Sequence, residues 1–284
     1  MSIKIEIKVK DIIIAIMLLT AIVLMAMFLV NVISNYGRPI GIEDGRGAEM
    51  ANAIGRNKSA SLARAHAALR DKYKDEDVSI MMIDPYNSEN NFELNADEVY
   101  ISASTYKLFV AYSMLNAVEK GEMSWDSPFD GSTLGACFET MIVDSDNDCP
   151  EAWLEYYKSY DFVTKEVRDI GMASTCLGCA GGMTTTARDL ANFLSRIYQG
   201  KILTSESRER LLEAMKRQIY RDGIPAGVDG NGIVADKVGF LDGLRHDAAI
   251  VYSNKGDYVL VVMTSSNSWT IAADVARTIQ RALN

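Results

Sequence analysis

The feature that most constrains this chain is an uncharged, strongly apolar run near its beginning. Residues 12–33 read IIIAIMLLTAIVLMAMFLVNVI and contain no charged side chain. A helix of this length rises about 1.5 Å per residue, or roughly 30 Å, which matches the hydrocarbon core of a bilayer. The run is longer than the apolar core of a signal peptide, and no convincing small-residue cleavage site follows it. We therefore expect an uncleaved transmembrane anchor at residues 11–33.

Charges beside this apolar run predict its orientation in the membrane, and the run separates a short tail from the rest of the chain. Three lysines lie in residues 1–10, and positively charged flanks stay in the cytoplasm. Residues 1–10 would then be a cytoplasmic tail, and residues 34–57, which are rich in Gly, Asn and charge, a linker. Residues 58–284 would form one domain outside the cytoplasm, with a helical lobe at about residues 121–221. The predicted location is the cell membrane, with a single pass.

Composition narrows the class of partner. The chain is 48% hydrophobic and 24% charged, as expected of a globular domain with a substantial core, and its net charge is −9. A nucleic-acid binder needs a basic face to neutralise phosphates, so no nucleic-acid partner is expected. We expect a monomer.

Four cysteines lie in the segment predicted to be exported. They are an even set in an oxidising compartment, so two disulfides are the default among three pairings. We favour Cys137–Cys149 and Cys176–Cys179, because each pair closes a short local segment. A four-cysteine zinc site remains the alternative, although only one C-x-x-C spacing is present.

The predicted elements run helix, strands, helices, strands, helix. Helices are expected from Ser59 and from Ser104, across most of residues 121–221, and near the end of the chain. Strands are expected at residues 78–83, 92–94, 99–101, 234–240, 248–252 and 258–263. This order predicts an α/β (α+β) fold, in which an antiparallel sheet is assembled from both ends of the chain and a helical lobe is inserted between them.

Histidine is too scarce for the commonest catalytic and metal centres. His66 and His246 are the only two, so a histidine-rich metal site is excluded. A Ser-His-Asp triad would need His246, but no G-x-S-x-G turn accompanies it. A serine nucleophile in this chain would therefore need a base other than histidine. Activation by another side chain requires no cofactor.

Ser104-Thr-Tyr-Lys107 offers that activation. A serine at the start of a helix and a lysine three residues later lie on one helical face. A buried lysine whose charged form is disfavoured loses its proton near neutral pH and acts as a base for the hydroxyl.

Two further motifs follow in a fixed order. Ser145-Asp146-Asn147 follows a helical segment, and Lys237-Val238-Gly239 lies in a predicted strand. The ordered set S-x-x-K, S-D-N, K-[ST]-G is typical of class A β-lactamases and penicillin-binding proteins. Over residues 58–284 the chain resembles that superfamily. The resemblance implies the β-lactamase/transpeptidase-like fold: a five-stranded antiparallel sheet, flanking terminal helices and an inserted helical lobe.

The resemblance also implies a role for each motif residue. Ser104 would be the nucleophile and Lys107 its general base. Ser145 would relay the proton to the leaving nitrogen, Asn147 would hold the acyl-side amide, and Lys237 would supply positive charge to Ser145 and to a substrate carboxylate.

Further roles follow from the third motif. The backbone N–H groups of Ser104 and Phe240 would form the oxyanion hole. Gly239 belongs to the substrate-binding motif, and Arg245 would be an additional carboxylate anchor. The Cys137–Cys149 pair also resembles a bridge found in that group.

Two departures from the family pattern bear on function. Class A β-lactamases carry a loop glutamate that activates the deacylating water, but residues 171–184 here contain no carboxylate. Val238 replaces the Thr or Ser of the third motif and donates no hydrogen bond to an anionic substrate. A hydrogen bond to a charged group contributes about 1.5–3 kcal/mol, so carboxylate recognition would be weakened.

These departures favour a D-alanyl-D-alanine-type peptidase that acts on peptidoglycan stem peptides and is acylated by β-lactams. One alternative is a class A-like β-lactamase that uses another water-activating group. The other is a sensor or binding domain for β-lactams or wall fragments, which is acylated or bound without turnover.

Overall fold

The computed structural model describes residues 45–230 and 232–283. The predicted tail and anchor and the first part of the linker lie outside the described residues. In the part that is described, no helix is long and apolar enough to cross a bilayer. The chain divides into two compact units between Gly55 and Arg56, and the fold below is that of the larger unit, which begins at Arg56.

A five-stranded sheet forms the centre of this unit, and each pair of neighbouring strands is antiparallel. The order across the sheet is β2–β1–β9–β8–β7. The bounds are β1 Val78–Ile83, β2 Phe92–Leu94, β7 Ile233–Leu241, β8 Leu244–Tyr252 and β9 Tyr258–Thr264. β1 and β9 are buried along their whole length, as expected of apolar strands covered on both faces. Strands from both ends of the chain therefore meet in one sheet, as predicted.

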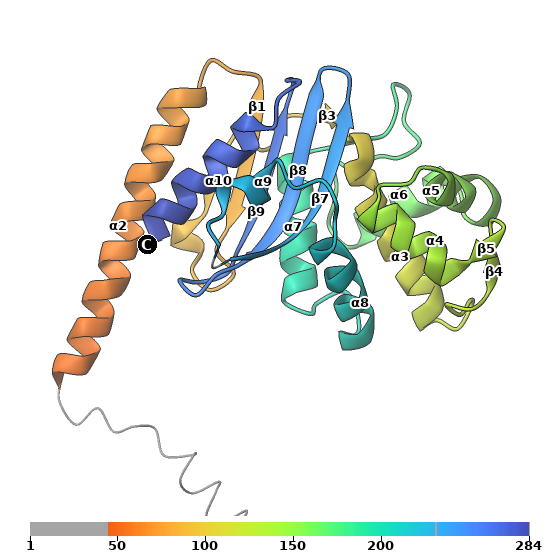
Figure 1. Cartoon of the computed structure of the whole chain (residues 1–284), viewed down its shortest axis with the longest axis horizontal. Coiled ribbons are helices and arrows are strands. Elements are labelled where there is room, and N and C mark those ends of the chain that lie inside the picture. Colours follow the sequence, from red (N-terminus) through yellow and green to blue (C-terminus); the bar gives the residue numbers. More distant parts are fainter. Residues whose placement is uncertain (1–44, 231, 284) are drawn as a thin grey trace, which may run out of the picture. The chain divides into compact units, whose positions relative to one another are not determined.

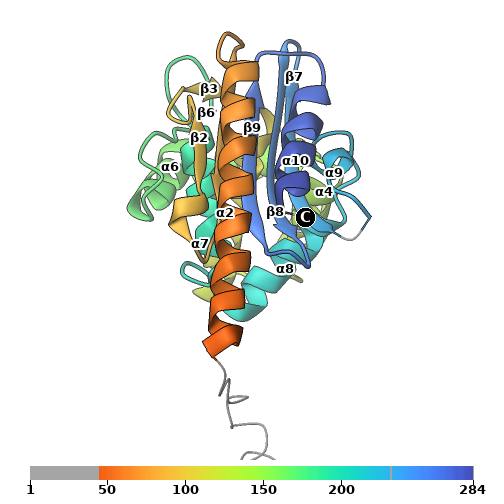
Figure 2. The ribbon, with the colours of Figure 1, turned by 90° about the vertical axis from the view of Figure 1, so that its left-hand side faces the viewer.

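One face of the sheet packs against the two terminal helices, α2 (Gly45–Tyr73) and α10 (Thr270–Leu283). Leu62 and Leu69 of α2 and Ile279 of α10 share a core with Ile80 and Met82 of β1. Figures 1 and 2 show both helices beside the sheet. The spacing of two between Ile80 and Met82 places both on this face, because side chains alternate along a strand.

The other face carries the helical lobe. Met81 of β1 and Val261 of β9 point into a core shared with Phe109 and Leu190. The elements are α3 Lys107–Glu119, α4 Leu134–Val143, α5 Asp148–Ala152, a π-helix at Trp153–Tyr157, α6 Tyr160–Asp169, α7 Ala187–Tyr198, α8 Ser205–Lys216 and α9 Ile224–Gly227. Short 3₁₀ helices lie at Ser88–Asn90 and Ala103–Tyr106, and two small sheets pair β3 (Tyr100–Ile101) with β6 (Thr184–Thr185) and β4 (Pro128–Phe129) with β5 (Ser132–Thr133).

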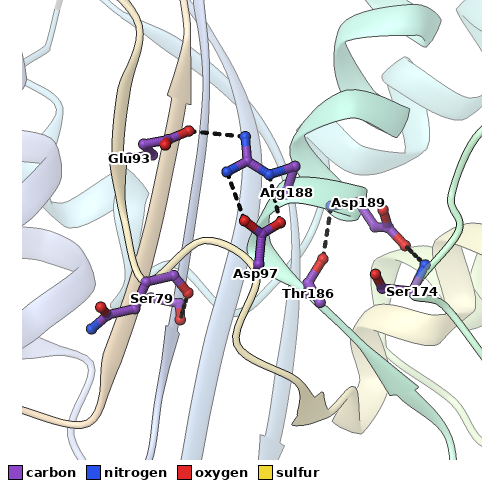
Figure 3. Close-up of polar contacts among 8 residues, drawn as sticks. Ser79, Glu93, Asp97, Ser174, Thr186, Arg188 and Asp189 are labelled. Atoms are coloured by element: carbon purple, nitrogen blue, oxygen red, sulfur yellow. Dashed lines mark hydrogen bonds and ion pairs between the residues drawn. The ribbon is translucent and has the colours of Figure 1, made fainter.

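The beginning of α7 holds the preceding loop in place (Figure 3). The Thr186 side chain accepts a hydrogen bond from the Asp189 amide at 3.1 Å and so caps this helix. The buried Asp189 carboxylate accepts bonds from the Ser174 amide at 2.9 Å and from the Thr175 hydroxyl at 2.8 Å. Nearby, Arg188 makes exposed ion pairs with Asp97 and Glu93. Residues 170–184 are thus tied to α7 by a buried carboxylate.

Most predicted elements are confirmed, with differences at their ends. The first helix begins at Gly45 rather than at Ser59, so the second half of the predicted linker is helical. Its glycines suggested a tether, but Ala, Met, Arg and Glu favour a helix and no proline interrupts them. The second helix also differs, because Ser104 lies in the 3₁₀ turn before α3.

Both favoured disulfides are present. Cys137 of α4 is bonded to Cys149 of α5, and Cys176 to Cys179. The zinc alternative is therefore wrong for these four residues. The first bridge joins the two helices that flank Ser145-Asp146-Asn147, and the second closes a turn within the loop between α6 and β6.

Candidate active site

Ser104 lines a cleft between the sheet and the helical lobe. The 3₁₀ turn at Ala103–Tyr106 leads directly into α3, and Ala103 has a left-handed backbone with φ of 44°. Such a conformation is unfavourable for a residue other than glycine and is concentrated at functional sites. The cleft encloses about 350 Å³, and Ser104, Ser145, Asn147 and Phe240 line it. A ligand can therefore reach the half-buried Ser104 side chain.

Lys107 begins α3 and is fully buried. Its Nζ donates to the Asn147 Oδ1 and to the Ser145 backbone oxygen at 2.6 Å each, and it lies 3.4 Å from Ser145 Oγ. Ser145 has φ of 60°, so the chain turns sharply and directs both its carbonyl and its hydroxyl toward the lysine. The first two motifs are thus joined by the lysine of the first.

Lys237 approaches the same serine from the sheet. This residue of β7 is fully buried, and its Nζ donates to Ser145 Oγ at 2.8 Å and to the Val238 carbonyl at 3.0 Å. Ser145 Oγ therefore lies between two lysine amines. The third motif joins the first two at this hydroxyl.

Burial shifts the titration of both lysines. It lowers the pKa of Lys107 to about 8, against the opposing influence of the Asp146 and Glu151 carboxylates. Burial, followed by the nearby charge of Lys107, lowers the pKa of Lys237 to about 7. Desolvation disfavours the charged form of an amine, so an uncharged amine is available near neutral pH. The lowered pKa values favour the predicted general-base role of Lys107, which stays a prediction.

The glycine of the third motif allows β7 to approach the nucleophile. A Cβ atom at Gly239 would lie 2.9 Å from the Ser102 carbonyl oxygen and 2.9 Å from the Thr105 amide nitrogen. Such contacts are too short, so only glycine permits this packing. The next residue, Phe240, then lines the cleft opposite Ser104, as an oxyanion hole formed by these two residues requires.

Comparison with known proteins identifies the family. A family model described as "Beta-lactamase enzyme family" matches residues 61–284. The chain belongs to the beta-lactamase enzyme family.

Solved structures of similar proteins have the same fold. The structure of PBP-A has a TM-score of 0.70 at 22% identity and covers 77% of this chain and 95% of its own. A beta-lactamase from Desulfarculus baarsii has a TM-score of 0.70 at 19% identity, covering 80% and 98%. A further match, at a TM-score of 0.69 and 22% identity over 78% and 96%, is the penicillin G acyl-enzyme of a PBP-A mutant in which glutamate replaces a leucine. The β-lactamase/transpeptidase-like fold is confirmed.

One curated relative is closer in sequence over a shorter segment. A beta-lactamase of Bacillus licheniformis is 37% identical over 110 residues, which is 36% of this chain and 36% of that protein. The match spans about a third of the relative's length, so it supports membership of the beta-lactamase enzyme family and leaves the substrate open.

The beta-lactamase-family cleft differs from the expected arrangement at its nucleophile. Among the described residues, no group is hydrogen-bonded to the Ser104 hydroxyl, and the Lys107 amine is bonded to Ser145 and Asn147 instead. Catalytic hydrogen bonds often tighten only when substrate is bound. Proton transfer from Ser104 to Lys107 would therefore need a small movement of either side chain.

Arg245, predicted as an additional carboxylate anchor, lies outside the cleft, and so does Val238 of the third motif. Arg245 pairs with Phe240 across β7 and β8, but its guanidinium donates to the Leu241 and Leu244 carbonyls at 2.6 and 2.7 Å. Arg245 is not among the residues that line the cleft. Val238 is 1% exposed and likewise does not line it. The role of Arg245 stays a prediction.

Both histidines are held by contacts within the fold, and neither lines the cleft. The ring of His66 stacks on Phe92 with centroids 4.7 Å apart, and burial lowers its pKa to about 4. His246 is fully buried: Nδ1 accepts from the Thr264 amide at 3.1 Å, and Nε2 lies 2.9 Å from the Ile101 carbonyl. In the described part of the chain, no cluster of His, Cys, Asp and Glu could hold a metal ion.

The structure adds cleft residues that the motifs do not contain. Glu151 and Tyr106 line the cleft beside the motif residues, and Met183 lines it from the end of the loop before β6. Met183 is held there by its carbonyl, which accepts from the Ser102 amide at 2.8 Å. A sequence signal for Glu151 did exist, because it follows Asn147 by one helical turn.

Proposed function

We propose that this chain is a serine acyl-enzyme hydrolase whose preferred substrates are the D-alanyl-D-alanine ends of peptidoglycan stem peptides, and that β-lactams acylate it. One observation carries the proposal: Ser104 faces a cleft in which two buried lysines of lowered pKa meet at Ser145. This arrangement activates an alcohol and delivers a proton to a leaving nitrogen without a histidine.

Acylation would proceed in one addition and one elimination. Ser104 Oγ attacks the substrate carbonyl, and its proton passes to the uncharged Lys107 amine. The oxyanion binds the N–H groups of Ser104 and Phe240, where hydrogen bonds in a shielded site stabilise developing charge strongly. Ser145 then donates its proton to the leaving nitrogen and recovers one from a lysine, so the C–N bond breaks. Lys237 contributes charge beside Ser145 and the substrate carboxylate, because the negative charge of that carboxylate opposes the lowering of the Lys237 pKa by burial.

The loop between α6 and β6 favours a peptidase over an efficient β-lactamase. Residues 171–184 supply no carboxylate to activate the deacylating water. The similar structure of PBP-A was obtained as a penicillin G acyl-enzyme in a mutant that carries an introduced glutamate. This loop therefore supplies no base for the release of a β-lactam acyl group, so release depends on a carboxylate from another part of the cleft.

Two features support action outside the cytoplasm, which we also propose. The apolar run at residues 12–33 is long enough to span a bilayer, and the two disulfides are typical of an oxidising compartment. Membrane fractionation combined with protease digestion of intact cells would test this. Digestion of the domain only after cell lysis would contradict it.

Intact-mass spectrometry with penicillin G is the decisive experiment on the chemistry. Opening of the β-lactam ring expels no group, so the wild-type chain should gain the full mass of penicillin while Ser104→Ala should not. Release of D-alanine from a stem-peptide mimic should depend on Ser104 in the same way. An unmodified wild-type chain would contradict the proposal.

A β-lactamase is the second candidate, and the carboxylate of Glu151 in the cleft favours it. Sustained nitrocefin turnover without release of D-alanine would select this candidate. Acylation that is never followed by release would instead indicate a sensor.

A further inference from the structure

Glu151 is the only carboxylate among the described residues that line the Ser104 cleft. It lies in α5, and its backbone N–H donates to the Asn147 carbonyl at 3.2 Å, which places it one turn after the second motif. Its side chain is exposed, and within the described part of the chain no hydrogen bond or ion pair engages the carboxylate. A carboxylate in this state is available to a water molecule in the cleft.

Glu151 is also close enough to the catalytic lysine to act on it. Burial lowers the pKa of Lys107, and the negative charges of Asp146 and then of Glu151 oppose that lowering. Glu151 and Ser104 line the same cleft, and Lys107 begins the helix that follows Ser104. A water held between them would face both the carboxylate and an acyl group on Ser104.

The other carboxylates near this lobe are engaged elsewhere. Glu166 pairs with Lys120 at 3.7 Å, and Lys120 follows Lys107 by almost four turns of α3, roughly 20 Å away. Asp146 accepts a bond from the Cys149 amide at 3.2 Å, and it lines a separate pocket with Cys137 and Cys149 instead of the Ser104 cleft.

We propose that Glu151 is the general base that activates the deacylating water, in place of a glutamate from the loop. This rests on the proposed function, because it requires an acyl group on Ser104. Glu151 takes a proton from water while the water oxygen bonds to the acyl carbon. The tetrahedral intermediate then breaks its bond to Ser104 Oγ, which recovers the proton. The products are a carboxylic acid and the free serine.

The test compares Glu151→Gln with the wild-type chain and with Glu155→Gln. Glu155 lies one turn further along, is exposed and does not line the cleft, so it is the matched control. Penicillin G is added, excess drug is removed, and intact-mass spectra follow formation and loss of the adduct. Glu151→Gln should form the adduct at nearly the wild-type rate but lose it about 100-fold more slowly, as expected for loss of a general base. Glu155→Gln should change neither rate.

Hydroxylamine distinguishes a catalytic from a structural role. It attacks an acyl-enzyme without a base to deprotonate it, so it should release the adduct from Glu151→Gln as fast as from the wild-type chain. Deacylation of Glu151→Gln at the wild-type rate, or an adduct that hydroxylamine cannot release, would overturn the role of Glu151. Absence of any adduct on the wild-type chain would instead overturn the proposed function itself, and Glu151 with it.

Discussion

Replacing Gly239 with alanine tests whether the sheet positions the nucleophile. The new Cβ would lie 2.9 Å from the Ser102 oxygen, 2.9 Å from the Thr105 nitrogen and 3.0 Å from Thr105 Cγ2. These atoms flank Ser104, and two of them are backbone atoms, which cannot rotate away. Ordinary contacts between such atoms are about 3.5–4 Å, so β7 and the 3₁₀ turn must separate by roughly 0.5–1 Å.

That separation moves Ser104 relative to Lys237 and Ser145. A misplacement of about 1 Å costs roughly 100-fold in rate, equivalent to about 2.7 kcal/mol of activation free energy. Overpacking should also lower the free energy of unfolding by about 1–3 kcal/mol. The loss of rate should therefore exceed what partial unfolding explains at temperatures well below melting.

The assay is the rate of acylation by penicillin G, read by intact mass, together with thermal unfolding. Gly230→Ala is the control, because Gly230 is exposed and a Cβ there meets no atom within 4 Å. The control should acylate and melt as the wild-type chain does. If Gly239→Ala also acylated at the wild-type rate and melted at the same temperature, the reasoning about the close approach of β7 would be refuted.

Three further predictions concern charge. The acylation rate should rise with pH through a midpoint near 8, because burial lowers the pKa of Lys107 to about 8; a midpoint near the ordinary lysine value would exclude it as the base. Burial raises the pKa of Asp247 to about 7, so the folded state favours its protonated form and loses stability as pH rises from about 4 through 7. Asp247→Asn should keep the bond from the Ile224 amide and raise the free energy of unfolding by about 2 kcal/mol at pH 8 but little at pH 4, measured by urea titration. Arg188→Ala should lower it by less than about 1 kcal/mol because its ion pairs are exposed, whereas Asp189→Ala should lower it by about 1.5–3 kcal/mol because its bonds to the loop are buried; equal losses would contradict this ranking.

The sequence was sufficient to predict that the three motifs converge in one cleft. It was not sufficient to predict the hydrogen bonds between their side chains. The order of Ser104, Ser145 and Lys237 along the chain is specific enough to predict one cleft, and the structure brings these residues together. The sequence could not tell which acceptors Lys107 would choose. A long side chain reaches several oxygens, and the left-handed turn at Ser145 offers it two.

The two misses have different physical causes. Glu151 carries no motif of its own, and its presence in the cleft depends on which side of α5 faces that cleft, which is a tertiary property. The beginning of α2 at Gly45 was missed because glycines were given more weight than the helix formers between them. Local patterns predict elements well, but not the direction in which an isolated polar side chain points.

The order of strands in the sheet affects when the chain becomes reactive during its synthesis. β1 pairs with β9, and Lys237 lies in β7, so both depend on the final portion of the polypeptide. A nascent chain that has emerged only through α8 carries Ser104, Lys107 and Ser145 but lacks Lys237 and three of the five strands. Contacts between such distant segments form late. We therefore expect an incomplete polypeptide to be inert toward antibiotics, with sensitivity appearing only once the last hairpin has joined the sheet.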